Sequence, residues 1–205
     1  MSEIEASGIK GVVSSVQLDV TDEKSVAEAA AYVEQEFGRL DVLVNNAAVG
    51  CMDPDIKTRF QLSMDTNVTG PAVVAEAFRP LLLKSQNPYS IFVSSGAGSL
   101  TRAASSDPKT YKGIKNGEAY QVSKAALNML AVLESTTHGS KGLKVFAMCP
   151  GFVRSNLRGP GEDAISGWGG AGPAEVSGET LLSIIEGKRD ADVGGFVHKD
   201  GVYPW

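Results

Sequence analysis

The chain has 205 residues, of which 42% are apolar and 21% charged, as in an ordinary globular protein that can bury one core. Its net charge of −5 and its scattered lysines and arginines argue against a nucleic-acid partner, because duplex binding needs clustered cations. No apolar run reaches the roughly 20 residues that span a bilayer, and the polar start MSEIEASGIKG is not a secretory signal, so we expect a cytoplasmic protein without a membrane partner.

The first predicted elements are a strand, a helix and a second strand. Residues 12–18 form a short β-branched run that is typical of a strand. Thr21 or Asp22 can cap the helix that follows, and Gly38 ends it. Residues 41–44 are a short apolar run that predicts a buried strand. Apolar residues recur on one face of the helix: Val26, Ala30, Val33 and Phe37.

The later elements continue this alternation. Residues 59–84 are predicted to be mostly helical, with a bend or an interruption at Gly70-Pro71. A buried strand is predicted at residues 90–93, and a Gly/Ser/Thr-rich loop follows at residues 96–117. The remaining predicted elements are a helix at 118–137, a strand at 143–149, a loop at 150–173, a helix at 174–186 and a last strand at 194–198.

Strands that alternate with helices predict an α/β fold with right-handed crossovers and a doubly wound parallel sheet. We therefore expect a Rossmann-like, three-layer α/β/α arrangement in a single domain over residues 1–205. Ligands bind outside the carboxyl ends of the strands in such sheets. The loops that follow Val44, Val93 and Cys149 are therefore the places to look for a site.

One helix carries a pair of residues suited to acid–base chemistry. Tyr120 and Lys124 are four positions apart, so they share a helical face. A free tyrosine has a pKa of roughly 10, and a neighbouring ammonium favours the phenolate. The pair is able to act as a general acid or base on a carbonyl or an alcohol. The same spacing also occurs by chance on amphipathic helices, so it does not decide the function by itself.

Polar residues follow the predicted strands. Ser94 and Ser95 end the strand at 90–93, where a hydroxyl is placed either to bind a substrate oxygen or to satisfy the turn backbone. Asn45 and Asn46 end the strand at 41–44, and a purely structural role is an alternative for them too. Cys51 and Cys149 match no metal spacing, so we expect no metal site and two small buried residues, or Cys51 in a substrate pocket.

Six motifs in one order resemble the short-chain dehydrogenase/reductase family, over about residues 12–205. The motifs are Asp19-Val20, Asn45-Asn46-Ala47-Ala48, Asn67-Val68-x-Gly70, Val93-Ser94-Ser95, Tyr120-x-x-x-Lys124 and Pro150-Gly151. The carboxyl-terminal residues 195–205 and the long stretch between Ser95 and Tyr120 are similar to the carbonyl-reductase-like branch. That stretch is expected to shape the substrate pocket.

The resemblance implies a role for each matching residue. Tyr120 is the expected proton donor and acceptor, and Lys124 is expected to favour its phenolate and to hold the nicotinamide ribose. Ser95, preferred over Ser94, is expected to bind the substrate oxygen, and Asn67 to hold a water molecule that links Lys124 to solvent. The cofactor contacts that the resemblance implies are Asp19, Val20, Asn45, Asn46, Ala47, Tyr120, Lys124, Pro150, Gly151, Val153 and Ser155.

One part of the family pattern is missing from the sequence. The family begins with a strand, a Gly-rich turn and a helix that together hold the cofactor pyrophosphate, and residues 1–11 do not supply them. We interpret the sequence as an N-terminally truncated form that lacks the first βαβ unit. Three explanations stay open: a segment absent from the given sequence, strands supplied by another chain or by a shifted third strand, or loss of dinucleotide chemistry.

The predicted function is the NADP(H)- or NAD(H)-dependent reduction of a ketone or aldehyde, or the reverse oxidation, with Tyr120 as the general acid and base. NADP is favoured over NAD by the carbonyl-reductase resemblance, although binding depends on the missing phosphate loop. The alternative is a protein without redox activity that acts as a cofactor-free acid–base catalyst or as a ligand-binding or regulatory protein. We expect a small-molecule carbonyl or alcohol substrate and a monomer or a homo-oligomer.

Overall fold

The computed structural model describes residues 11–105 and 117–205, and its strands form one sheet in the order β1-β2-β3-β4-β5. The first four strands are parallel, and β5 runs antiparallel to β4. The bounds are β1 (Val42–Asn45), β2 (Tyr89–Val93), β3 (Lys144–Met148), β4 (Phe196–His198) and β5 (Gly201–Tyr203). The predicted parallel sheet is therefore confirmed, and β5 is a strand that the sequence analysis missed.

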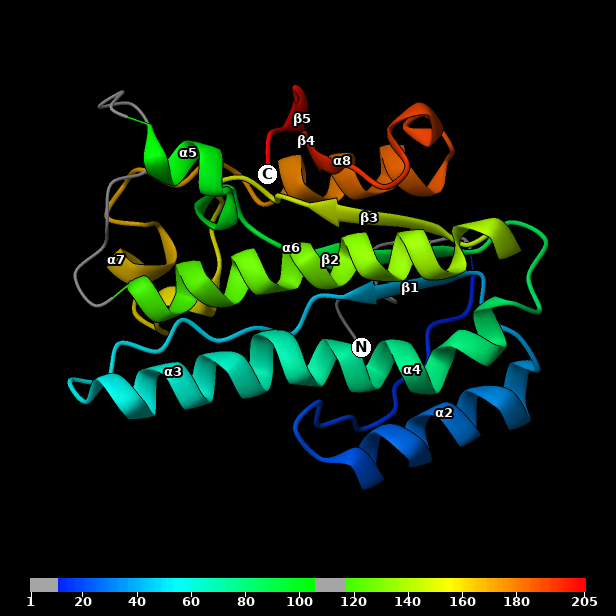
Figure 1. The fold of residues 1–205 in the computed structure, drawn as a ribbon. Coiled ribbons are helices and arrows are strands. Elements are labelled where there is room, and N and C mark those ends of the chain that lie inside the picture. The colour runs from blue at the N-terminus through cyan, green and yellow to red at the C-terminus, as the bar shows by residue number, and fades with distance from the viewer. Residues whose placement is uncertain (1–10, 106–116) are drawn as a thin grey trace.

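Helices cover both faces of this sheet, which confirms the predicted three-layer α/β/α class (Figure 1). On one face, Leu127 and Ala131 of α6 pack with Phe92 of β2. On the other face, Ile184 of α8 packs with Phe146 of β3. The helix bounds are α2 (Glu23–Phe37), α3 (Ile56–Met64), α4 (Gly70–Leu82), α5 (Leu100–Ala104), α6 (Glu118–His138), α7 (Glu162–Ile165) and α8 (Glu175–Ile185).

Helices α3 and α4 run on from one another through a π-helical turn, η1 (Asp65–Thr69), and look like one long helix in Figure 1. The sequence predicted a bend or an interruption at Gly70-Pro71, and Pro71 lies in the first turn of α4, directly after this π-helical turn. Gly70 is needed because a Cβ there would lie 2.9 Å from Cγ2 of Val20.

The predicted strand at residues 12–18 is wrong, because this segment has no regular secondary structure. Val12 is 99% exposed. A strand needs a neighbour for its backbone groups, and among the described residues no strand pairs with this segment. Leu18 and Val20 instead pack as side chains against the core between α2 and α4. Strand β1 therefore forms the edge of the sheet within the described part of the chain.

The two predicted loops contain short helices. Residues 96–105 form a 3-10 turn, η2 (Gly96–Gly98), and then α5, whereas residues 106–116 of the same predicted loop lie outside the described residues. The loop at 150–173 contains η4 (Asn156–Arg158) and α7. Two further 3-10 turns are η3 (Gly139–Lys141) and η5 (Asp190–Asp192). Within the described ranges, no helix has the length and apolar character needed to cross a membrane.

Candidate active site

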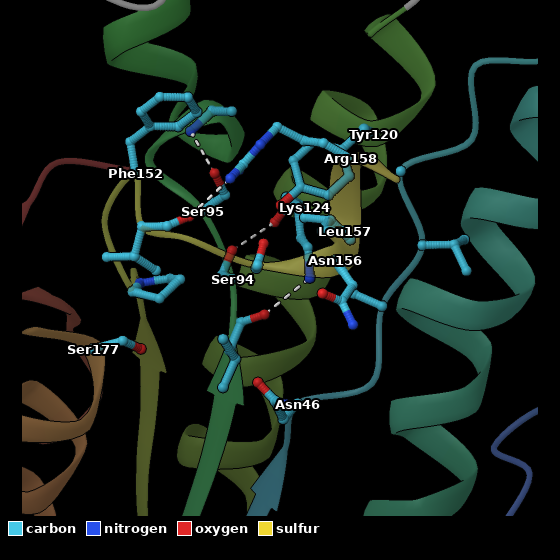
Figure 2. Close-up of a pocket in the computed structure, with 18 of the residues that line it drawn as sticks. Asn46, Ser94, Ser95, Tyr120, Lys124, Phe152, Asn156, Leu157, Arg158 and Ser177 are labelled. Carbon is cyan, nitrogen blue, oxygen red and sulfur yellow. Dashed lines mark hydrogen bonds between the residues drawn. The ribbon is translucent and has the colours of Figure 1, made fainter. Parts of the chain in front are cut away.

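A cavity of about 1130 Å³ opens at the carboxyl ends of β1, β2 and β3. Its walls come mainly from three loops, at residues 46–52, 93–97 and 150–159, and from the first two turns of α6; Leu62, Thr66 and the start of α8 complete them. The loops are those expected from the strand ends of a doubly wound sheet. Figure 2 shows side chains from these separate segments around one pocket, with Ser95, Tyr120 and Lys124 among them. Cys51 also lines the cavity, as one reading of the sequence expected.

Tyr120 and Lys124 lie one turn apart on α6, and both line the cavity. Nζ of Lys124 lies 5.7 Å from the centre of the Tyr120 ring. It also donates a hydrogen bond of 2.9 Å to the carbonyl oxygen of Val93, at the end of β2. Lys124 is only 2% exposed, and burial lowers its pKa from 10.5 to about 8. The ammonium thus lies beside the phenol ring, anchored to the strand that carries the serines.

The two serines after β2 have different partners. Oγ of Ser94 donates to Oδ1 of Asn128 at 2.5 Å and to the carbonyl oxygen of Lys124 at 3.2 Å, and the residue is 1% exposed. Oγ of Ser95 accepts a 3.2 Å hydrogen bond from the amide of Ala97, and its own proton has no acceptor among the described residues. Ser94 therefore joins β2 to α6, whereas Ser95 keeps a hydroxyl proton for a ligand in the cavity.

A glycine sets how closely the loop after β2, residues 94–98, called the serine loop below, approaches α6. A Cβ at Gly98 would lie 2.6 Å from the backbone carbonyl carbon of Lys124 and 2.8 Å from the amide nitrogen of Ala125. No side chain fits there, since both neighbours are backbone atoms. The loop and α6 thus approach as closely as a glycine allows, and this contact sets Ser95 relative to Lys124.

Asn67 lies in the π-helical turn and is fully buried. Its amide nitrogen donates to the carbonyl oxygen of Val49 at 3.0 Å and to Oγ of Ser123 at 2.9 Å. Its amide oxygen accepts from the amide of Val49 at 2.8 Å. Asn67 thereby connects a cavity loop to α6 at the residue before Lys124, but it is not itself among the lining residues. Its expected role in holding a water molecule stays a prediction.

The residues expected to contact a cofactor fall into two groups. Most of them line the cavity: Asn46, Ala47, Tyr120, Lys124, Pro150, Gly151, Val153 and Ser155. Asn45 is buried behind this wall, with its amide nitrogen lacking a hydrogen-bond partner among the described residues. Asp19 and Val20 lie away from the cavity, and the Asp19 carboxylate accepts hydrogen bonds from Thr21, which lower its pKa. The structure does not bring these two residues to the site.

The sequence analysis missed two arginines near the site. Arg59 of α3 is 5% exposed, donates to the backbone carbonyl oxygens of Asp53 and Pro54, and pairs with Glu118 in the first turn of α6. Arg158 of η4 lines the cavity. Neither arginine belongs to a motif. Arg59 and its partner Glu118 are 59 positions apart in the sequence. No local sequence signal was available to find them.

The fold, the cavity and the ordered motifs agree with the comparisons with known proteins. A family model described as short chain dehydrogenase matches residues 1–165. The chain belongs to the short-chain dehydrogenase/reductase family, a family of oxidoreductases that act on small-molecule substrates. The family predicted from the sequence is thus confirmed.

Individual relatives agree with this assignment. The chain is 36% identical over 203 residues to the short-chain dehydrogenase/reductase tropE of Talaromyces stipitatus, covering 92% of this chain and 75% of that protein. It is 35% identical to eupG of a Phoma species, covering 95% and 79%. Among solved structures, NADPH-bound carbonyl reductase from chicken fatty liver superposes with a TM-score of 0.80 and 26% identity, covering 100% of this chain and 81% of that one.

Proposed function

We propose that this protein catalyses the nicotinamide-dependent reduction of a ketone or aldehyde, and the reverse oxidation of the alcohol. The observation that carries the proposal is the convergence of Tyr120, Lys124 and Ser95 on one cavity. A phenol, an ammonium that favours its anion, and a hydroxyl donor are the groups that protonation of a carbonyl oxygen requires. The family membership of the chain supports the same reaction class.

Each residue of the proposed mechanism acts on the carbonyl oxygen. Ser95 donates its hydroxyl proton in a hydrogen bond to that oxygen and orients the substrate. When bound, a reduced nicotinamide supplies the hydride that attacks the carbonyl carbon. Tyr120 gives its proton to the oxygen as the C–H bond forms, and the charged Lys124 stabilises the phenolate that remains. In the oxidation direction, the phenolate takes the hydroxyl proton back from the alcohol.

The cavity fits the nicotinamide-ribose half of a dinucleotide. Lys124 uses one N–H on Val93, and its other two donors have no partner among the described residues, so they suit ribose hydroxyls. Gly151 has a φ of +85° and only the Val153 side chain within 4 Å of its Cβ position, which leaves its backbone open to the cavity. Asn46, Pro150 and Ser155 are further proposed contacts. NADP is proposed ahead of NAD, since the similar chicken carbonyl reductase is NADPH-bound.

Replacement of Tyr120 tests this proposal. Tyr120→Phe removes only the hydroxyl group, so we expect carbonyl reduction to fall by a factor of about 100 or more, the usual contribution of a general acid. NADPH oxidation with a panel of aldehydes and ketones measures the rate. Circular dichroism and NADPH titration serve as controls that the variant folds and still binds the cofactor. A variant that turns over as fast as the wild type would refute the assignment of Tyr120.

A further inference from the structure

The charge of the cavity is opposite to that of the whole chain. The protein has a net charge of −5, yet no described residue that lines the cavity is Asp or Glu. Three lining residues are cations: Lys124, Arg154 and Arg158. Lys124 belongs to the proposed proton-transfer machinery. The two arginines lie in the loop after β3 and have no part in that mechanism.

Arg154 is neutralised by a neighbour and faces outward. It forms a 2.8 Å ion pair with Glu162 at the start of α7, and its side chain is 43% exposed. An exposed pair of this kind contributes little and attracts a ligand weakly. Arg154 therefore leaves little uncompensated charge for the cavity.

Arg158 is held by several hydrogen bonds and forms no ion pair with any residue that the structure describes. Its Nε donates to the carbonyl oxygen of Ala164 at 2.9 Å, and its Nη2 donates to those of Val153 and Ile165, also at 2.9 Å. The guanidinium carbon lies 4.7 Å from the centre of the Phe152 ring. No carboxylate of the described residues forms an ion pair with it, and Nη1 has no hydrogen-bond partner among them. A guanidinium fixed in this way is preorganised to receive an anion.

Much of the remaining lining of the cavity is apolar. The apolar residues that line the same cavity as Arg158 include Phe152, Leu157, Met52, Leu62 and Val49. Figure 2 shows Phe152 and Leu157 with Arg158 around the pocket. An apolar wall suits the carbon skeleton of a ligand, whereas a single unpaired cation suits one anionic group on it. The combination describes a ligand that is hydrophobic with one acidic end.

We propose that Arg158 binds a carboxylate of the substrate, so that the enzyme reduces hydrophobic carbonyl compounds that carry an acid group. The inference rests on the proposed function, because it places the carbonyl at Ser95 and Tyr120 and the carboxylate at Nη1 of Arg158. A cofactor phosphate offers the same anionic oxygen chemistry. The experiment must therefore separate a substrate carboxylate from a cofactor phosphate.

The test compares an acid with its neutral ester. The probes are para-formylbenzoate and its biphenyl analogue, each with its methyl ester, and NADPH is the reductant. For the wild type we expect a higher kcat/KM with the acid. In Arg158→Gln, the ratio of acid to ester kcat/KM should fall about 10- to 100-fold, which corresponds to the loss of a hydrogen-bonded charge. Arg158→Lys keeps the charge without the fork and should retain part of the preference.

Arg154→Gln is the matched control, because it removes a cation from the same loop and should keep the wild-type ratio. An equal preference for acid and ester in the wild type overturns the inference, as does the same loss of ratio in both glutamine variants. If Arg158→Gln weakens NADPH binding and leaves the ratio unchanged, the anion is a cofactor phosphate and the substrate assignment is wrong.

Failure of the proposed function gives a different pattern. In that case the wild type turns over none of the four probes. Calorimetric titration with the acid and the ester then tests Arg158 without catalysis. Tighter binding of the acid that is lost in Arg158→Gln supports the carboxylate site, and equal binding of both probes overturns it.

Discussion

Lys124 carries a positive charge into a buried position, and this has a cost for folding. Burial lowers the pKa of Lys124 from 10.5 to about 8, while the unfolded chain keeps the ordinary value. Between about pH 8 and pH 10.5, the unfolded state therefore carries more bound proton at Lys124 than the folded state does. The contribution of Lys124 to the free energy of unfolding is lowest below pH 8 and rises as the pH increases through that window. A structural lysine is seldom placed at such a cost, which agrees with a role in the proposed chemistry.

This linkage predicts a pH dependence that Lys124→Met removes. Between pH 7 and pH 9, the free energy of unfolding of the wild type should rise by about 1 kcal/mol relative to the variant. The orphaned carbonyl of Val93 affects the variant equally at both pH values, so it cancels. Urea denaturation of both proteins at the two pH values gives the comparison. Parallel changes in wild type and variant would mean that burial does not lower the pKa of Lys124 in the folded protein.

The residues of the motifs were predictable because they depend on local spacing. Tyr120 and Lys124 share a face through the four-residue interval alone, and Ser95 follows a strand whose apolar run marks its end. Asn67 was placed in a helix, but its contacts with Val49 and Ser123 span 18 and 56 positions, so they could not be foreseen. Arg158 was missed for a different reason, since its acceptors lie only five to seven positions away. Its acceptors are backbone oxygens, which carry no residue-specific signal.

The elements around the site are held together by close backbone contacts. The turn η2 lies against α6 at Gly98, and the amide of Gly96 donates to Sγ of Cys149 at 3.1 Å. The chain end docks beside them, where the carbonyl oxygen of Trp205 accepts from the amide of Thr101 at 2.9 Å. The serine loop is therefore fixed from both sides, by the catalytic helix and by the segment after β5.

Gly98→Ala tests the contact between the serine loop and α6. The added methyl group meets backbone atoms at 2.6 and 2.8 Å, so the loop or the helix must move. We expect a loss of about 1–3 kcal/mol in the free energy of unfolding, as for other overpacked sites, and a fall in kcat. Gly139→Ala is the control, because nothing lies within 4 Å of its Cβ position and its backbone is helical. Thermal unfolding and steady-state rates should separate the two variants, and a Gly98→Ala protein as stable and active as the control would contradict this reading.

The strands were predictable in proportion to their burial. Strands β2 and β3 are almost wholly buried and appear in the sequence as continuous apolar runs. Strand β5 has only three residues and begins at Gly201, so it lacks both length and pattern. The segment at 12–18 has the right residues for a strand, but propensity alone cannot supply the neighbouring strand that pairing requires. Both errors arose because strand formation depends on pairing with a neighbouring strand, which local sequence does not specify.

The whole molecule combines an acidic surface with a cationic cavity at the carboxyl edge of its sheet. In the described part of the chain the sheet ends at β1, and the chain spans 75% of the length of its relative tropE. The residues proposed for proton transfer and for the nicotinamide ribose line the same cavity. Two of the residues expected to contact the cofactor, Asp19 and Val20, are not among the residues that line it. The proposed function therefore depends most on the affinity of the whole chain for the cofactor.

Calorimetric titration of the chain with NADPH and NADH tests this claim most directly. We predict micromolar binding of NADPH, about 8 kcal/mol of binding free energy, and weaker binding of NADH. Lys124→Met should weaken NADPH binding by about tenfold or more, because it removes the proposed ribose contact. A well-folded wild-type protein that binds neither cofactor, or a variant that binds NADPH as tightly as the wild type, would contradict the placement of the cofactor in this cavity.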